Sequence, residues 1–155
     1  DLMDAAQTTF ISSTFWTERI GPSAAIKTLE IMEREKSYEQ ITSIGKNIKD
    51  GWRTCAEKHE LDINIFGLDA LACFSFNSPN SLKYKTLISQ ELLKSGILAG
   101  TSVYVCTAHS KDIIEYYFEK LDSVFSLISD CENGELPIDK ALTSEVCHSS
   151  FKRLN

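Results

Sequence analysis

Two short runs of strand-forming residues, 63–66 and 71–76, constrain the fold more than any other part of the chain. Residues 67–70 join them, and a connection this short fits antiparallel neighbours. The second run alternates its apolar residues as a half-buried strand does, with Ala72, Phe74 and Phe76 on one face. The stretch therefore predicts a β-hairpin with one face in a core, and Gly67 is expected to end its first strand.

Helical spacing of apolar residues precedes this hairpin. Pro22 favours the first turn of a helix over residues 22–36. Ser37-Tyr38-Glu39-Gln40 has the capping-box pattern, so a second helix should follow and end near residue 59. Its stripe at spacings of three and four consists of Ile41, Ile44, Ile48, Trp52 and Cys55. We expect the two helices to be bent or broken at Lys36-Ser37.

Two more helices follow the hairpin. The first begins near Ser81 and has Gly96 as its C-terminal stop, and the second covers 111–130 with Ser110 as its cap. The expected buried residues of the first are Tyr84, Leu87, Ile88, Leu92 and Leu93. Those of the second are Ile113, Ile114, Tyr117, Leu121, Val124, Phe125 and Ile128.

The remaining expected elements are two short strands at 97–99 and 103–106 and a short helix over 137–142. A length of 155 residues suits one ordinary domain. The order of strands and helices predicts an α+β fold, in which helices cover an antiparallel sheet and long linking helices precede it.

Composition narrows the possible partners. The net charge of −6 leaves no basic field to neutralise a nucleic-acid backbone. No apolar run reaches bilayer length, and the chain starts Asp1-Leu2-Met3-Asp4 without a signal-like stretch. We therefore expect no nucleic-acid partner, no membrane span and a cytoplasmic location. A start at Asp1 suggests a processed chain or a piece of a longer one.

The five cysteines and three histidines show no metal-site spacing. An odd number of cysteines without a C-x-x-C pair favours reduced thiols in a cytoplasmic protein. Cys147-His148, with His59 and His109 elsewhere in the chain, is a poor zinc signature because adjacent ligands lack the usual loop spacing. A hydrolase that uses Cys147 and His148 is a weak hypothesis too, since no orienting acid is evident. We therefore expect no metal site.

A run of hydroxyl side chains, Ser12-Ser13-Thr14, precedes the helix start at Gly21-Pro22. Hydroxyls and free backbone N–H groups near a helix N-terminus favour an anion such as phosphate. The run also fits an ordinary hydroxyl-rich strand end that caps a helix, and the residues alone leave both interpretations open.

Three stretches together resemble one enzyme family. The first is Ser12-Ser13-Thr14-Phe15 with the alanine-rich segment 24–29 behind it. The second is Lys94-Ser95-Gly96-Ile97-Leu98-Ala99-Gly100, and the third is Thr107-Ala108-His109-Ser110-Lys111-Asp112-Ile113. In this order and spacing they resemble the C-terminal portion of a class III pyridoxal-phosphate aminotransferase, most like the glutamate-1-semialdehyde aminomutase branch.

The resemblance implies a fold, a cofactor and a partner. The fold is the C-terminal small domain of an aspartate-aminotransferase-like (fold type I) enzyme, in a homodimer that binds pyridoxal 5′-phosphate. Residues 1–21 would be the end of a large-domain strand and the phosphate loop, 22–59 the linking helices, and 60–155 the small domain. Thr14 would reach across the dimer to the cofactor phosphate of the other subunit, and the backbone N–H of Ser13 would join it.

The chain departs from the family pattern at two places. Relatives carry Gly-Asn-Pro shortly after the threonine, where this chain has Thr17-Glu18-Arg19. Residues 96–109 contain no arginine, so there is no candidate here for the group that holds a substrate carboxylate in some relatives. The substrate is defined no further than a small amino or oxo compound.

Amino transfer in this family needs a lysine upstream of the threonine loop. Every lysine of this sequence, from Lys27 onward, follows Thr14. The resemblance therefore implies that this stretch contributes phosphate contact, small-domain closure and dimer surface, supplies no catalytic residue and does not transaminate alone. The alternative is a non-catalytic binding or interaction module that reuses the small-domain fold.

Overall fold

The computed structural model describes residues 2–7 and 18–149 of the chain. The chain divides into two compact units, Asp1–Ser37 and Tyr38–Asn155. Among the described residues, the hydrophobic core lies in the second unit.

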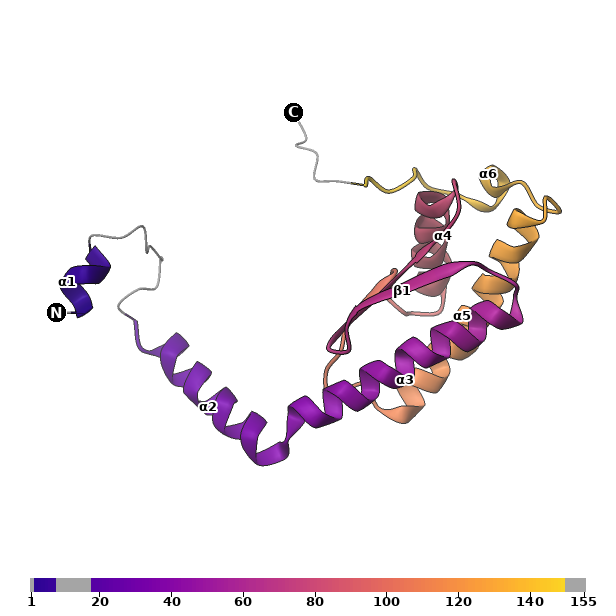
Figure 1. The fold of residues 1–155 in the computed structure, drawn as a ribbon. Helices are drawn as coiled ribbons and strands as arrows, with labels where there is room; N and C mark the ends of the chain where they lie inside the picture. Colours follow the sequence, from indigo (N-terminus) through magenta and orange to yellow (C-terminus); the bar gives the residue numbers. More distant parts are fainter. Residues whose placement is uncertain (1, 8–17, 150–155) are drawn as a thin grey trace. The chain divides into compact units, whose positions relative to one another are not determined.

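Two helices, α1 (Leu2–Gln7) and α2 (Ile20–Glu35), make up the described part of the first unit (Figure 1). The Glu18 carboxylate caps α2, since it accepts hydrogen bonds from the first two helical N–H groups at 3.0 and 2.6 Å. The helix ends where Lys36 adopts a left-handed conformation with φ of 48°. The predicted helix over 22–36 is therefore confirmed.

Every residue of α2 is exposed, including its large apolar side chains. These side chains are Ile20, Ile26, Leu29, Ile31 and Met32. Neither α2 nor any other helix in the described ranges combines the length and apolar character that crossing a membrane requires. The described part of the first unit thus presents an apolar surface along α2.

The next helix, α3 (Ser37–Lys58), begins directly after Lys36 and confirms the predicted break at this point. The predicted cap is wrong. Ser37 is the first residue of the helix, and its buried Oγ has no hydrogen-bond partner within the described residues. A capping residue needs a non-helical backbone, and the turn out of α2 has already been made one residue earlier, at Lys36.

The second unit places a three-stranded sheet beside its helices (Figure 1). After α3 come β1 (Ile63–Leu68), β2 (Leu71–Phe76), α4 (Ser81–Lys94), β3 (Ser102–Tyr104), α5 (Lys111–Glu132) and α6 (Ile138–Ala141). The strands follow the order β1-β2-β3, and both pairs are antiparallel. This arrangement confirms the predicted α+β class.

The strands β1 and β2 form the predicted hairpin, but its turn is tighter than expected. Leu68 pairs with Leu71, so only residues 69–70 make the turn. Gly67 does not end the strand, because it pairs with Ala72 and the ladder continues past it. Its φ of 83° is a left-handed value that glycine adopts at little cost.

Residues 97–99 are not a strand, contrary to the prediction. The helix α4 ends in a Schellman motif, in which the N–H groups of Gly96 (φ 76°) and of the next residue each bond to the last helical turn at 3.0 Å. The carbonyl of Ala99 then accepts a hydrogen bond from the Ser89 hydroxyl of α4 at 2.9 Å. These bonds hold the segment against the helix, so β3 starts only at Ser102 and is shorter than the strand predicted for 103–106.

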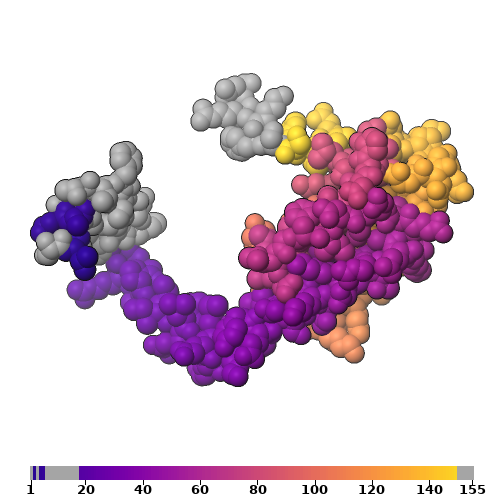
Figure 2. Space-filling view, viewed as in Figure 1, coloured from indigo at the N-terminus to yellow at the C-terminus, as the bar shows by residue number. Residues whose placement is uncertain are grey.

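The core lies between the inward face of the sheet and the helices α3, α4 and α5. Figure 2 shows the second unit as a densely filled body. The ring centroids of Trp52 and Phe74 are 4.7 Å apart, and that of Phe125 is 6.0 Å from Phe74. The largest fully buried side chains are Trp52, Tyr84, Phe74, Phe125, Leu87, Ile88, Leu92, Leu121 and Ile128. Two predicted core residues, Leu93 and Ile113, are exposed instead.

The outward face of the sheet carries apolar side chains that are exposed to solvent. The strand register places Phe66, Leu68, Leu71 and Tyr104 on this face. Leu68 and Tyr104 are 75% and 78% exposed. An apolar face of this kind is typical of a surface that another protein segment covers.

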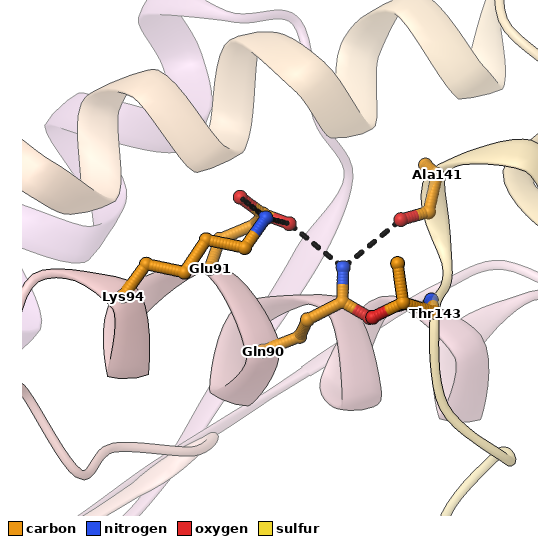
Figure 3. A network of polar contacts seen from close by, with 5 residues as sticks. All are labelled: Gln90, Glu91, Lys94, Ala141 and Thr143. Carbon is orange, nitrogen blue, oxygen red and sulfur yellow. Dashed lines mark hydrogen bonds and ion pairs between the residues drawn. The ribbon is translucent and has the colours of Figure 1, made fainter.

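One amide side chain ties the segment after α6 to α4 (Figure 3). Gln90 Nε2 donates to the Ala141 carbonyl at 2.9 Å and to the Glu91 carboxylate at 2.7 Å. Its Oε1 accepts from the N–H and the hydroxyl of Thr143 at 2.7 and 2.9 Å. Partial burial raises the pKa of Glu91, but hydrogen bonds from Lys94 and Gln90 outweigh this effect, so the pKa lies below its ordinary value.

The hairpin turn packs against α3 where the helix carries a glycine. Lys49 Nζ donates to the Gly67 carbonyl at 2.7 Å and to the Asp69 carboxylate at 2.9 Å. One helical turn earlier, a Cβ on Gly45 would overlap the backbone carbonyl of Asp69. The turn and the helix therefore approach each other too closely for a side chain at residue 45.

We predict that Gly45→Ala lowers the free energy of unfolding by about 1–2 kcal/mol. Because the new Cβ would meet a backbone carbonyl, the overpacking cost should lie at about 2–3 kcal/mol, and the better helix propensity of alanine offsets about 1 kcal/mol of it. The matched control is Gly100→Ala, whose new Cβ would meet only the Ser89 hydroxyl at 3.8 Å. Denaturant unfolding of both variants checks this, and equal stability of Gly45→Ala and the parent would contradict the close approach.

Candidate functional site

The predicted phosphate-binding residues, Ser13 and Thr14, lie outside the described residues. Their contact with a cofactor phosphate stays a prediction. The other two stretches that carry the family resemblance are described, and their residues meet in one place.

That place is a pocket of about 310 Å³ in the second unit, at the side of the sheet where β3, α3 and α5 converge. Its wall includes Ile97, Leu98 and Ala99 from the stretch after α4, and His109 and Ile113 from the stretch that begins α5. The remaining lining residues are Ile48, Ser102, Val103, Tyr104, Ile114 and Tyr117. The fold thus brings together two stretches that the sequence singled out separately.

The imidazole of His109 is one of the polar groups in the wall of this pocket. Its Nδ1 accepts a hydrogen bond from the backbone N–H of Cys106 at 3.0 Å, and the Cys106 thiol lies 3.6 Å from the same nitrogen. Because Nδ1 serves as an acceptor, the neutral ring carries its proton on Nε2. Ser110 accepts a hydrogen bond from Ile113 N–H at 3.4 Å, which confirms it as the cap of α5.

Tyr117 is a structural part of the pocket wall. Its hydroxyl accepts a hydrogen bond from Trp52 Nε1 at 2.8 Å, and Trp52 is fully buried. Burial raises the pKa of Tyr117 far above the ordinary tyrosine value. The phenol therefore stays protonated at physiological pH and holds the indole in place.

The lining residues do not fit a phosphate group. They include no lysine and no arginine, and a phosphate dianion is held by several short donors or cations. The predominantly apolar wall suits instead the apolar part of a small ligand or of a facing protein surface.

A second cluster, which the sequence did not predict, joins α3 to α5. The cluster consists of Cys55, His59 and Asp122. His59 Nε2 lies 2.9 Å from Asp122 Oδ1. Burial raises the pKa of the Cys55 thiol to about 11, and the Asp122 carboxylate adds to the rise. Hydrogen bonds from Lys58 and then His59 hold the pKa of Asp122 below its ordinary value. The four-residue spacing of Cys55 and His59 is a signal that places both on one helix face.

The pair Cys147-His148 does not form a catalytic arrangement. The Cys147 N–H donates to the Thr86 hydroxyl at 3.0 Å, and its thiol donates to the Leu82 carbonyl at 3.6 Å. The thiol is therefore directed at α4. All five cysteines are free.

Comparison with known proteins gives one consistent result. No protein-family model matches the chain. Over 127 residues the chain is 23% identical to aminopentol aminotransferase of Sphingopyxis macrogoltabida, covering 81% of this chain and 30% of that protein. Over 121 residues it is 25% identical to 3-aminobutyryl-CoA aminotransferase of Cloacimonas acidaminovorans (strain Evry), covering 75% of this chain and 29% of that protein.

A solved structure agrees with these relatives. The structure of the PLP internal aldimine form of the FumI protein of Sphingopyxis sp. MTA144 matches with a TM-score of 0.73 and 21% identity, over 90% of this chain and 34% of that one. The chain has the fold of part of this pyridoxal-phosphate-binding protein. The resemblance seen in the sequence and the predicted small-domain fold are confirmed at this level.

The aminotransferase fold is present here only in part. The chain spans about 30% of the length of the curated relatives it matches. This partial coverage fits the predicted C-terminal portion.

We predict that Tyr117→Phe destabilises the second unit by about 1–3 kcal/mol, because it leaves the buried Trp52 Nε1–H without a partner. The matched control is Tyr116→Phe, which removes a hydroxyl that donates to Ser95 at the surface. That variant should change the free energy of unfolding by less than about 1 kcal/mol. Thermal or denaturant unfolding compares the two, and equal effects would exclude a special role for the Trp52 hydrogen bond.

Proposed function

We propose that this chain is the C-terminal part of a class III pyridoxal-phosphate-dependent aminotransferase or aminomutase of the glutamate-1-semialdehyde type, acting on a small amino or oxo compound. The observation that carries the proposal is the fold match over 90% of the chain to a pyridoxal-phosphate protein. Two curated aminotransferases support it from the sequence side.

In this proposal Ser13 and Thr14 hold the phosphate end of the cofactor. A hydroxyl and a backbone N–H beside a helix start are suitable donors for a dianion. When bound, pyridoxal phosphate supplies the electron sink that amino transfer requires. The pocket beside His109 does not compete for this role, since its lining includes no lysine and no arginine.

The described residues would act as a wall and a docking surface. The apolar pocket would face the substrate side of the enzyme and exclude water when the small domain closes. The exposed apolar side chains of α2 and of the outward sheet face support a surface that the large domain and the second subunit of a homodimer cover. Residues 1–21, 22–59 and 60–155 keep their proposed roles as phosphate loop, linking helices and small domain.

We propose that these 155 residues have no transaminase activity by themselves and belong to a cytoplasmic enzyme. Every lysine follows Thr14, whereas the lysine that binds the cofactor lies upstream in the family. Five free thiols support a reducing compartment.

The test of the proposed function uses the intact enzyme that contains this chain. It should bind pyridoxal phosphate with visible absorbance that disappears on borohydride reduction, and the 155-residue chain alone should show no amino transfer. An intact protein without cofactor affinity would overturn the proposal and favour the non-catalytic module.

The phosphate contact has its own test. Thr14→Val should weaken cofactor binding about tenfold or more, because a hydrogen bond to a charged group contributes about 1.5–3 kcal/mol. Thr17→Val, a change of the same chemistry three residues later, should leave the affinity unchanged. Cofactor titration of both variants decides, and equal affinities would exclude Thr14 while leaving the aminotransferase assignment intact.

A further inference from the structure

The cluster between α3 and α5 has the composition of a metal site. Cys55 lies in the last turns of α3, His59 follows directly after the helix end at Lys58, and Asp122 faces them from α5. A thiolate, an imidazole and a carboxylate are the three kinds of group that bind zinc in proteins. Their ligand atoms all lie within 4.8 Å of one another.

The distances in this cluster are close to those around a bound ion. His59 Nε2 is 2.9 Å and Cys55 Sγ 4.0 Å from Asp122 Oδ1. Tetrahedral zinc with its ordinary bond lengths holds such atoms about 3.2–3.6 Å apart. Changes of about half an ångström in these two separations, and of at most about 1.2 Å in the separation between Cys55 Sγ and His59 Nε2, would give the spacing around one ion.

We propose that Cys55, His59 and Asp122 bind a zinc-like divalent ion with a fourth position open to water. The thiol ligand selects borderline-soft ions such as Zn²⁺ and Co²⁺ over Mg²⁺ and Ca²⁺, which prefer oxygen. On binding, the Cys55 proton passes to solvent, and the bound thiolate and carboxylate balance the two charges of the ion.

Lys58 is the cation that pairs with Asp122 in this cluster. Its ammonium donates to both carboxylate oxygens of Asp122, at 2.7 and 2.8 Å. Its side chain is 61% exposed, so it is free to swing into water when an ion takes its place. Binding therefore exchanges one cation for another and leaves no new buried charge unpaired.

An ion can reach the cluster from solvent. A groove of about 290 Å³ is lined by Cys55, Lys58 and Asp122, together with Gly51, Thr54 and Phe118. Two of the ligands, Cys55 and Asp122, belong to α3 and α5, which both contribute to the core, and His59 directly follows α3. A bound ion would cross-link α3 and α5, and its expected effect is on stability; this inference does not depend on the proposed enzyme activity.

Cobalt titration of the full chain, with the same pyridoxal-phosphate content in every sample, tests the site. Co²⁺ should produce visible d–d bands and a thiolate-to-cobalt charge-transfer band in the near ultraviolet, and Zn²⁺ should displace it. Cys55→Ser should abolish the charge-transfer band. His59→Asn and Asp122→Asn should each weaken binding by at least about tenfold, because even loss of an outer-shell partner costs about 10–100-fold.

Control variants separate this site from the Cys106–His109 pair, the other described thiol–imidazole contact. Cys106→Ser and His109→Asn should leave the cobalt spectrum unchanged. If either removes the bands, or if cobalt binds without a charge-transfer band, the assignment is overturned. Cys55 is part of the core, so circular dichroism checks whether Cys55→Ser still folds. If it does not, the cobalt affinity of His59→Asn, a change at a half-buried position, decides the test. Unchanged cobalt affinity in His59→Asn also overturns the proposal.

Zn²⁺ should also raise the melting temperature of the parent chain relative to a chelator-treated sample, by the amount that its affinity and concentration dictate. The shift should disappear in His59→Asn and persist in His109→Asn. An equal shift in both variants would mean that zinc acts elsewhere.

Discussion

The burial of Trp52 holds the second unit together. This side chain is fully buried, packs its ring on Phe74 of the sheet, and donates its indole N–H to Tyr117 of α5. One residue therefore fixes α3 against both the sheet and the last long helix. The pocket depends on Trp52 because Tyr117 and Ile48 form part of the pocket wall. The Cys55 cluster depends on Trp52 because Cys55 lies one turn further along the same helix.

Much of this fold follows from local sequence patterns. The alternation in 71–76 predicted the buried face of β2 correctly, and the serine at 110 predicted the start of α5, because both signals act within a few residues. The patterns failed where a neighbour decides the outcome. Residues 97–99 are apolar enough for a strand, but the Ile97 N–H and the Ala99 carbonyl form hydrogen bonds with α4 and not with a neighbouring strand. Leu93 lies on the predicted apolar stripe, yet the tertiary packing leaves it exposed.

The candidate sites were less predictable than the fold. The cluster of Cys55, His59 and Asp122 joins residues more than sixty positions apart, so only the i, i+4 spacing of the first two was visible in the sequence. The pocket unites two stretches noted for their family resemblance, and the packing of α5 on the sheet creates it. Ser13 and Thr14 were named from the resemblance, and the described residues leave that assignment as a prediction.

The open outward face of the sheet has a consequence for handling the chain. Among the described strands, β1 and β3 are both edges, so each has a row of backbone N–H and C=O groups without a strand partner. Beside these edges lie Phe66, Leu68 and Tyr104, all exposed. Unprotected edges next to apolar side chains template intermolecular strand pairing. Without the protein surface that covers this face, the chain should self-associate. Its degree of aggregation would therefore indicate whether that surface is bound.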